Sequence, residues 1–350
     1  MRFVAKNAMF LTVFLFSFFI ASAISAEAKF QASYLYHLSN FYGPLPYQWA
    51  TLFVDQEARE VYAIDRQQGD VTVFNEEGME IYSFGEGNAF GNISDGAVDG
   101  SGDILLLSRG TIVRCNYRGE PIGKIAFHDF PPDYKSFSPV RFVFRDNRFY
   151  LADMLGMRIA VTDEVGHFLK GYDIVSMLRE QGMTENDEKK ADTGMFGFSV
   201  DRDGNLLCTI PGLFSAFRIS PDGKVVGFGR SGSGPGKFGV ASGIVSDERG
   251  YYYVSDRLRC VVLVFDNNLK FIGEFGYRGY RKGNLIVPDD LAVDREGRLY
   301  IAQAAKRGVS VYRVREQAQR SGLRPDLTKS KGGDQPENAG SELSQETDGK

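Results

Sequence analysis

Basic and tyrosine side chains recur at positions where this chain turns. Arginine and tyrosine are favoured at the centres of binding contacts, and binding residues tend to lie on loops carried by a rigid scaffold. We therefore expect a contact surface for a partner protein, or for an anionic glycan or peptide, if the fold gathers these loops on one face. An ordinary solvated surface is the alternative, because Arg and Lys are common on any surface. The candidate binding residues are Arg66, Arg109, Tyr134, Arg230, Lys237, Arg257, Arg259, Tyr277, Arg281, Lys306 and Arg307.

A second set of candidate residues is acidic. Asp95, Asp289 and Asp290 could offer carboxylate oxygens to a metal ion, with Asn92 nearby. Oxygen ligands suit Ca²⁺, so calcium is the cofactor that these residues suggest, although their spacing matches no recognised metal motif. The alternative is a structural ion pair across the channel between Arg141 and Asp95 or Asp290, with no metal involved.

The stretch 229–276 predicts the element that must position these residues. Four short apolar segments, 243–246, 251–254, 261–265 and 271–275, are separated by polar turns that contain Asp, Asn and Gly. Segments of this length, rich in β-branched and aromatic residues, are typical of antiparallel strands. Four such strands in about 45 residues predict one blade of a β-propeller.

The same unit recurs along the chain, and an aspartate at the first turn marks it. The equivalent positions are Asp55, Asp99, Arg145, Asp201, Asp247 and Asp294. Their spacing of 44–47 residues, with one interval of 56, predicts six units. The fold class is therefore all-β, a six-bladed propeller of four-stranded antiparallel blades. The last unit lacks a fourth strand, and the stretch 33–38 is expected to supply it and so close the ring.

Strand alternation predicts which side chains face the propeller axis. One level of the innermost strands is Thr51, Asp95, Arg141, Gly197, Gly243 and Asp290. The level two residues later is almost entirely apolar: Phe53, Ala97, Val143, Ser199, Val245 and Ala292. The same topology sends most of the basic loops to one face of the ring, because loops between second and third strands leave on the same side as the connections between blades.

Several other chemistries lack the residues that they need. His37, His128 and His167 fall in or beside predicted outermost strands, so a three-histidine zinc site at the axis is not expected. No Gly-x-Ser-x-Gly elbow is present, and no Cys-x-x-Cys-His haem motif. The three cysteines, Cys115, Cys208 and Cys260, are expected to be buried thiols, with a Cys208–Cys260 bridge as the alternative.

The units resemble the NHL-repeat family. The likeness is carried by the lead-in Gly232–Phe238, by Tyr253-Val254-x-Asp256, by Val264-Phe265-Asp266 and by Glu274-Phe275-Gly276, with Asp153 and Arg158-Ile159 in the third unit. The resemblance covers about residues 30–315 and implies a six-bladed propeller of an exported, bacterial type. Members of the family include RNA binders, enzymes and scaffolds, so the resemblance leaves function open.

The two ends of the chain differ in composition from the repeats. Residues 1–28 combine a basic start, an apolar run and small residues, which predicts a secretory signal peptide, with an uncleaved membrane anchor as the alternative. The propeller is expected over 29–315, with an insertion at about 173–193 that begins with a helix capped by Asp173. Residues 316–350 are polar and are expected to be disordered.

Together these features predict an exported, periplasmic or extracellular binding or assembly module that uses its basic, tyrosine-bearing face. A net charge of −4 and export both argue against a nucleic-acid partner, and membrane contact is expected only if the N-terminal segment is uncleaved. The alternative function is a calcium-dependent, lactonase-like or lyase-like enzyme that uses the axial carboxylates.

Overall fold

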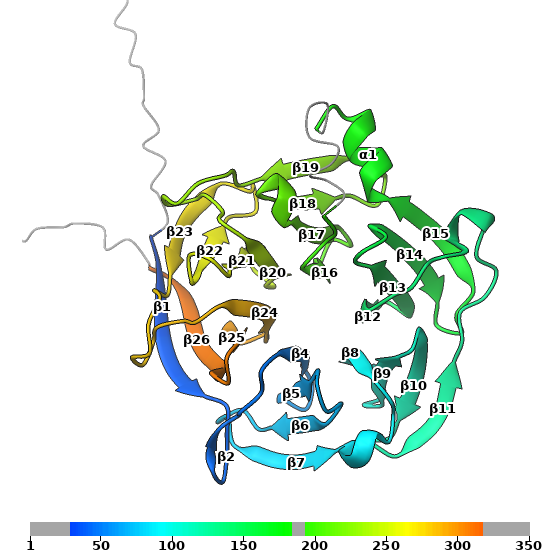
Figure 1. Cartoon of the computed structure of the whole chain (residues 1–350), viewed down its shortest axis with the longest axis horizontal. Coiled ribbons are helices and arrows are strands. Elements are labelled where there is room, and N and C mark those ends of the chain that lie inside the picture. The colour runs from blue at the N-terminus through cyan, green and yellow to red at the C-terminus, as the bar shows by residue number, and fades with distance from the viewer. Residues whose placement is uncertain (1–28, 184–192, 318–350) are drawn as a thin grey trace, which may run out of the picture. The chain divides into compact units, whose positions relative to one another are not determined.

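The computed structural model describes residues 29–183 and 193–317. The predicted signal segment, the middle of the insertion (184–192) and the tail from residue 318 lie outside these residues. The described chain forms six four-stranded antiparallel sheets arranged as blades around an axis (Figure 1). The predicted fold class, an all-β six-bladed propeller, is confirmed.

Each blade is a meander whose first strand is innermost. Blade one contains β4 (Ala50–Asp55), β5 (Glu60–Asp65), β6 (Val71–Phe74) and β7 (Glu80–Phe84). Blade two contains β8 (Ile93–Val98), β9 (Ile104–Ser108), β10 (Thr111–Cys115) and β11 (Pro121–Ile125). Blade three contains β12 (Arg141–Arg145), β13 (Arg148–Asp153), β14 (Arg158–Asp163) and β15 (Phe168–Asp173).

The remaining blades follow the same plan. Blade four contains β16 (Phe198–Val200), β17 (Leu206–Ile210), β18 (Ser215–Ile219) and β19 (Val225–Phe228). Blade five contains β20 (Ala241–Ser246), β21 (Tyr252–Asp256), β22 (Val261–Phe265) and β23 (Phe271–Phe275). Blade six contains β24 (Pro288–Val293), β25 (Arg298–Gln303), β26 (Gly308–Gln317) and β1 (Lys29–His37).

The sixth blade closes the ring with strands from both ends of the propeller. Strand β1 pairs antiparallel with β26, from Lys29 opposite Gln317 to His37 opposite Ser310. The predicted closure by an N-terminal strand is therefore confirmed. The strand pair is longer than expected, because it begins at Lys29 and β26 continues to Gln317.

Short elements lie in the connections between strands. A two-stranded hairpin, β2 (Ser39–Asn40) with β3 (Gly43–Pro44), follows β1. Helix α1 (Ile174–Glu180) begins the insertion, and the Asp173 carboxylate accepts from the Ser176 N–H, as predicted for its N-cap. Three single-turn 3₁₀ helices are η1 (Glu86–Asn88), η2 (Pro132–Tyr134) and η3 (Pro211–Leu213).

The aspartate that marks each repeat has a structural cause. In blade five, Asp247 Oδ1 accepts from the N–H groups of Arg249 and Tyr251, both at 3.0 Å, and so holds the turn between the first two strands. Gly250 completes this turn with φ of +86°. Blade three departs from the pattern at Arg145 because it uses a two-residue turn, in which Asp146 and Asn147 both have positive φ.

Glycine at the start of the innermost strands is required by close packing of the blades. A Cβ atom on Gly197 would lie 2.2 Å from the Ser242 backbone oxygen, and one on Gly243 would lie 2.5 Å from the Asp289 backbone oxygen. A backbone atom cannot turn aside as a side chain can. The close spacing of blades four, five and six therefore depends on the absence of a side chain at these two positions.

The hydrophobic core lies between neighbouring blades. Phe53 and Ile64 of blade one pack in one cluster with Leu106 of blade two, and Val264 of blade five packs with Ile301 of blade six. Each blade thus buries its faces against its neighbours.

The cysteines are buried and free, so the alternative Cys208–Cys260 bridge is wrong. Cys208 lies on β17 of blade four, opposite Phe217 on β18, whereas Cys260 lies in the turn before β22. Within the described residues, no helix is long and apolar enough to cross a bilayer.

We expect Gly243→Ala to lower the free energy of unfolding by about 1–3 kcal/mol, because the new methyl group collides with backbone of the next blade. Chemical denaturation measures this change. The matched control is Gly123→Ala on β11, where an added Cβ meets nothing within 4 Å. Equal effects of the two substitutions would contradict the packing explanation.

Candidate functional site

The axis of the propeller is polar at one level and apolar at the next. All six residues of the predicted apolar ring line an axial cavity of about 310 Å³, and they are Phe53, Ala97, Val143, Ser199, Val245 and Ala292. Two residues earlier along the innermost strands, three charged residues meet at the axis: Asp95, Arg141 and Asp290. The predicted change from polar to apolar along this pleat face is confirmed.

Arg141 joins three blades at the axis. Its Nη1 and Nη2 donate to Oδ2 and Oδ1 of Asp290 at 3.2 and 2.8 Å, a forked pair from blade three to blade six. Its Nε lies 3.2 Å from Asp95 Oδ2 in blade two, but without hydrogen-bond geometry. The structural ion pair that the sequence suggested is therefore present, and it involves both aspartates.

The two aspartates also hold backbone groups of neighbouring blades. Asp290 Oδ2 accepts from the Leu52 N–H at 2.9 Å, and Asp95 Oδ2 accepts from the Phe142 N–H at 2.8 Å. Burial raises the pKa of Asp95 to about 6, although the Arg141 charge and the Phe142 N–H act in the opposite direction. Desolvation of the carboxylate therefore outweighs its pairing.

A second ion-pair layer is centred on Asp289. Arg257 Nε donates to Asp289 Oδ1 at 2.8 Å, and its Nη2 contacts the same oxygen. Arg66 Nη2 lies 3.2 Å from Asp289 Oδ2, and Arg66 Nε donates to Thr51 Oγ1 at 2.8 Å. Both guanidinium groups are fixed by their Nε and Nη2 atoms, and neither Nη1 has an acceptor within the described residues.

Aromatic rings hold Arg257 in place as well. Its guanidinium carbon lies 5.2 Å from the centroid of Trp49 and 4.8 Å from that of Phe196. These are cation–π distances. Trp49 belongs to the connection before β4 and Phe196 to the one before β16, so two other loops converge on the loop that carries this arginine.

Four of these residues line a cavity at the mouth of the axis, which we call the axial mouth: Arg66, Arg141, Phe196 and Arg257. It has a volume of about 420 Å³, and among the described residues no acidic side chain lines it. Because Arg141 lines both this cavity and the axial cavity, its ion pairs lie between the two. The residues of the axial mouth are Arg66, Asn92, Ile93, Ser94, Val140, Arg141, Met154, Met195, Phe196 and Arg257.

The three candidate calcium ligands do not form a set that fits the ion. Asp95 and Asp290 share Arg141, and Asp289 pairs with Arg257, so a cation would have to displace a guanidinium group from each carboxylate. Within residues 29–183 and 193–317, no group of three potential ligands is arranged to hold a metal. The donor chemistry of this site suits an anion.

Other candidate binding residues are occupied in holding loops. Arg259 donates to the carbonyl oxygens of Ser233 and Lys237 and pairs with Glu274 at 2.5 Å. Arg307 lies over the Tyr280 ring, with its guanidinium carbon 5.3 Å from the centroid. Their side chains stabilise the connections before and after blade five.

The remaining candidates are more accessible but do not join the axial mouth. Tyr277 is 71% exposed. Arg230, Arg281 and Lys306 are exposed, and Lys237 is half-buried. The predicted basic face is therefore not one surface. Of the candidate binding residues, Arg66 and Arg257 line the axial mouth, others hold loops, and the rest are scattered over the surface.

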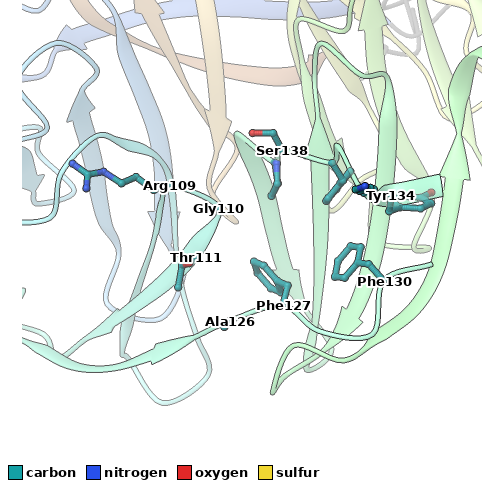
Figure 2. A pocket seen from close by; sticks show the side chains of 11 residues that line it. Arg109, Gly110, Thr111, Ala126, Phe127, Phe130, Tyr134 and Ser138 are labelled. Carbon is teal, nitrogen blue, oxygen red and sulfur yellow. The ribbon is translucent and has the colours of Figure 1, made fainter. Parts of the chain in front are cut away.

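Arg109 and Tyr134 line a separate cavity of about 510 Å³ between β10 and the connection from blade two to blade three. Figure 2 shows the Phe127 and Phe130 rings on one side of it, with the Arg109 side chain extending away from them. Tyr134 is half-buried, its hydroxyl donates to the Ile159 carbonyl oxygen at 3.2 Å, and burial raises its pKa to about 12. This tyrosine mainly supports the connection.

The sequence did not point to Trp49, Phe196, Met154 or Met195 as site residues. They come from connections of different length and have no common repeat position. A single tryptophan in a 350-residue chain, four residues before the Phe53 ring position, was the one available signal.

Comparison with solved structures supports the class of fold. The chain is similar to β-propeller proteins, at identities that show the fold alone. No family model and no curated protein matches it.

Three solved structures illustrate the similarity. A protein of unknown function from Bacteroides thetaiotaomicron is 14% identical, with a TM-score of 0.59 over 83% of this chain and 77% of that one. A gluconolactonase from Xanthomonas campestris is 14% identical, with a TM-score of 0.54 over 84% and 93%. Virginiamycin B lyase from Staphylococcus aureus is 12% identical, with a TM-score of 0.53 over 82% and 99%.

The raised pKa of Asp95 predicts a pH dependence of stability. A folded-state pKa above the unfolded value means that the folded protein binds this proton more tightly. The stabilisation is present below about pH 4 and is lost as the pH rises through about 6. Relative to Asp95→Asn, which cannot ionise, we expect wild type to lose on the order of 2 kcal/mol between pH 4 and 7.

Urea denaturation of both proteins across this pH range measures the difference. A difference that instead grows in favour of wild type as the pH rises would show that the Arg141 charge outweighs desolvation, contrary to this expectation.

Proposed function

We propose that this protein is an exported propeller of the NHL-repeat type that acts as a binding module, and that its axial mouth receives an anionic group of a partner. The axial mouth carries the proposal: three arginines and one amide line it, and none of its lining residues in 29–183 and 193–317 is acidic. Export and the NHL-repeat relationship are supported by the sequence features of residues 1–28 and of the repeats.

The arginines of the axial mouth are arranged for binding rather than only for stability. Arg66 is held by hydrogen bonds to Thr51 Oγ1 and the Ala50 carbonyl oxygen, and Arg257 by Asp289, while the Nη1 atoms of both remain for a ligand. Side chains held in this way lose little entropy when they bind. The metal-dependent enzyme is not favoured, because the axial carboxylates are committed to arginines.

We expect the double substitution Arg66→Gln with Arg257→Gln to abolish capture of the partner, because it removes two of the three charges of the axial mouth. The immobilised full chain would be exposed to the exported fraction of the source cells at low ionic strength. Wild-type capture should weaken as salt is raised, since charge pairing is screened.

The control is Arg109→Gln, which removes an exposed arginine that lines the other cavity. Melting temperatures of all variants are compared, and Arg66→Gln alone is used if the double variant melts early. Capture that survives loss of both arginines would refute binding at the axial mouth.

A further inference from the structure

We infer that the anionic group received at the axial mouth is a peptide carboxylate next to an apolar side chain, in the simplest form the C-terminal residue of a partner chain. This inference rests on the proposed function and gives it a ligand class. It follows from the donors of the site, the charges behind them, the apolar wall and the closed floor.

The donors favour a planar ligand with two oxygens. Nη1 of Arg66 and Nη1 of Arg257 both remain for a ligand, and both side chains contact the same carboxylate, Asp289, so their guanidinium groups lie close together. One Nη1 from each guanidinium group can donate to one of the two oxygens of a single carboxylate, and such charge-assisted hydrogen bonds are strong. The Asn92 amide, at the rim of the same cavity, can donate to a peptide carbonyl oxygen.

The charges behind the arginines favour a single negative charge. Asp289 and Asp290 are already paired there. Asp65 and Asp256 precede Arg66 and Arg257 in the same turns, where they accept from the N–H groups of Gln67 and Leu258 at 2.8 and 3.0 Å. These carboxylates repel a second negative charge, so a dianionic phosphate is less suited than a carboxylate.

The wall of the cavity favours a peptide over a glycan. Five of its ten lining residues are apolar: Ile93, Val140, Met154, Met195 and Phe196. Phe196 is 42% and Val140 41% exposed, so no described residue covers this part of the wall. Methionine adapts to side chains of different shape, whereas a uronic acid polymer presents mainly hydroxyl groups, which gain nothing from such a wall.

The floor of the cavity favours the end of a chain. Arg141 lines the axial mouth and, with Asp95 and Asp290, closes the way to the axial cavity. A peptide cannot thread through the propeller and must enter by its end or by a side chain. A C-terminal residue brings its carboxylate and its apolar side chain into such a blind cavity together.

The test uses the full chain and four N-acetylated probes: Ala-Ala-Leu as the free acid, the same peptide as its C-terminal amide, Ala-Ala-Ser as the free acid, and a phosphoserine peptide amide. Trigalacturonate is the glycan probe. Trp49 is the only tryptophan and lies 5.2 Å from Arg257, so its emission reports on the axial mouth. Calorimetry provides an independent affinity.

We expect the Leu acid to bind at least tenfold more tightly than its amide and more tightly than the Ser acid. Arg66→Gln should weaken it at least tenfold, and Arg109→Gln should leave it unchanged. Tighter binding of the phosphopeptide or of trigalacturonate would overturn the carboxylate inference while leaving anion binding at the axial mouth intact. Equal affinity for acid and amide, or no binding of the acid, would also overturn it, and partner capture then tests the proposed function separately.

Discussion

The ion pairs of Arg141 are the constraint on which the centre of this propeller depends. One guanidinium group from blade three is neutralised by carboxylates from blades two and six. Each carboxylate also accepts a backbone N–H from a neighbouring blade, Asp95 from blade three and Asp290 from blade one. Removing one partner of such a buried cluster leaves an unpaired charge, which costs about 3–5 kcal/mol. The cluster therefore fixes the relative position of several innermost strands and also forms the floor of the axial mouth.

The fold was predictable because its causes are local and repeat. The Asp-x-x-Gly turn at Asp247 recurs with the blade period, and the glycines at 197 and 243 mark close approach between backbones. Strand alternation was enough to predict the apolar axial ring and the polar level before it. The closing role of β1 followed from counting strands in the last unit.

The site was predictable only in part, because it is not made by the repeat. Arg66 and Arg257 were predicted as basic loop residues. The sequence does not distinguish their role from that of Arg259, because the role depends on which carbonyl and carboxylate oxygens lie within reach of each side chain. Trp49 and Phe196 reach Arg257 from two connections of unrelated length. Distances between irregular loops are set by the completed ring, and no spacing in the sequence encodes them.

The pairing of β1 with β26 has a consequence for how the chain is made. Strand β1 can pair along its whole length only after the chain has grown by 288 residues beyond Lys29, since Lys29 pairs with Gln317. Before β26 has been synthesised, β1 has no strand to pair with. The first five blades can form while the sixth is still incomplete. The ring of this chain, which we propose is exported, therefore cannot close until all of residues 29–317 have been synthesised.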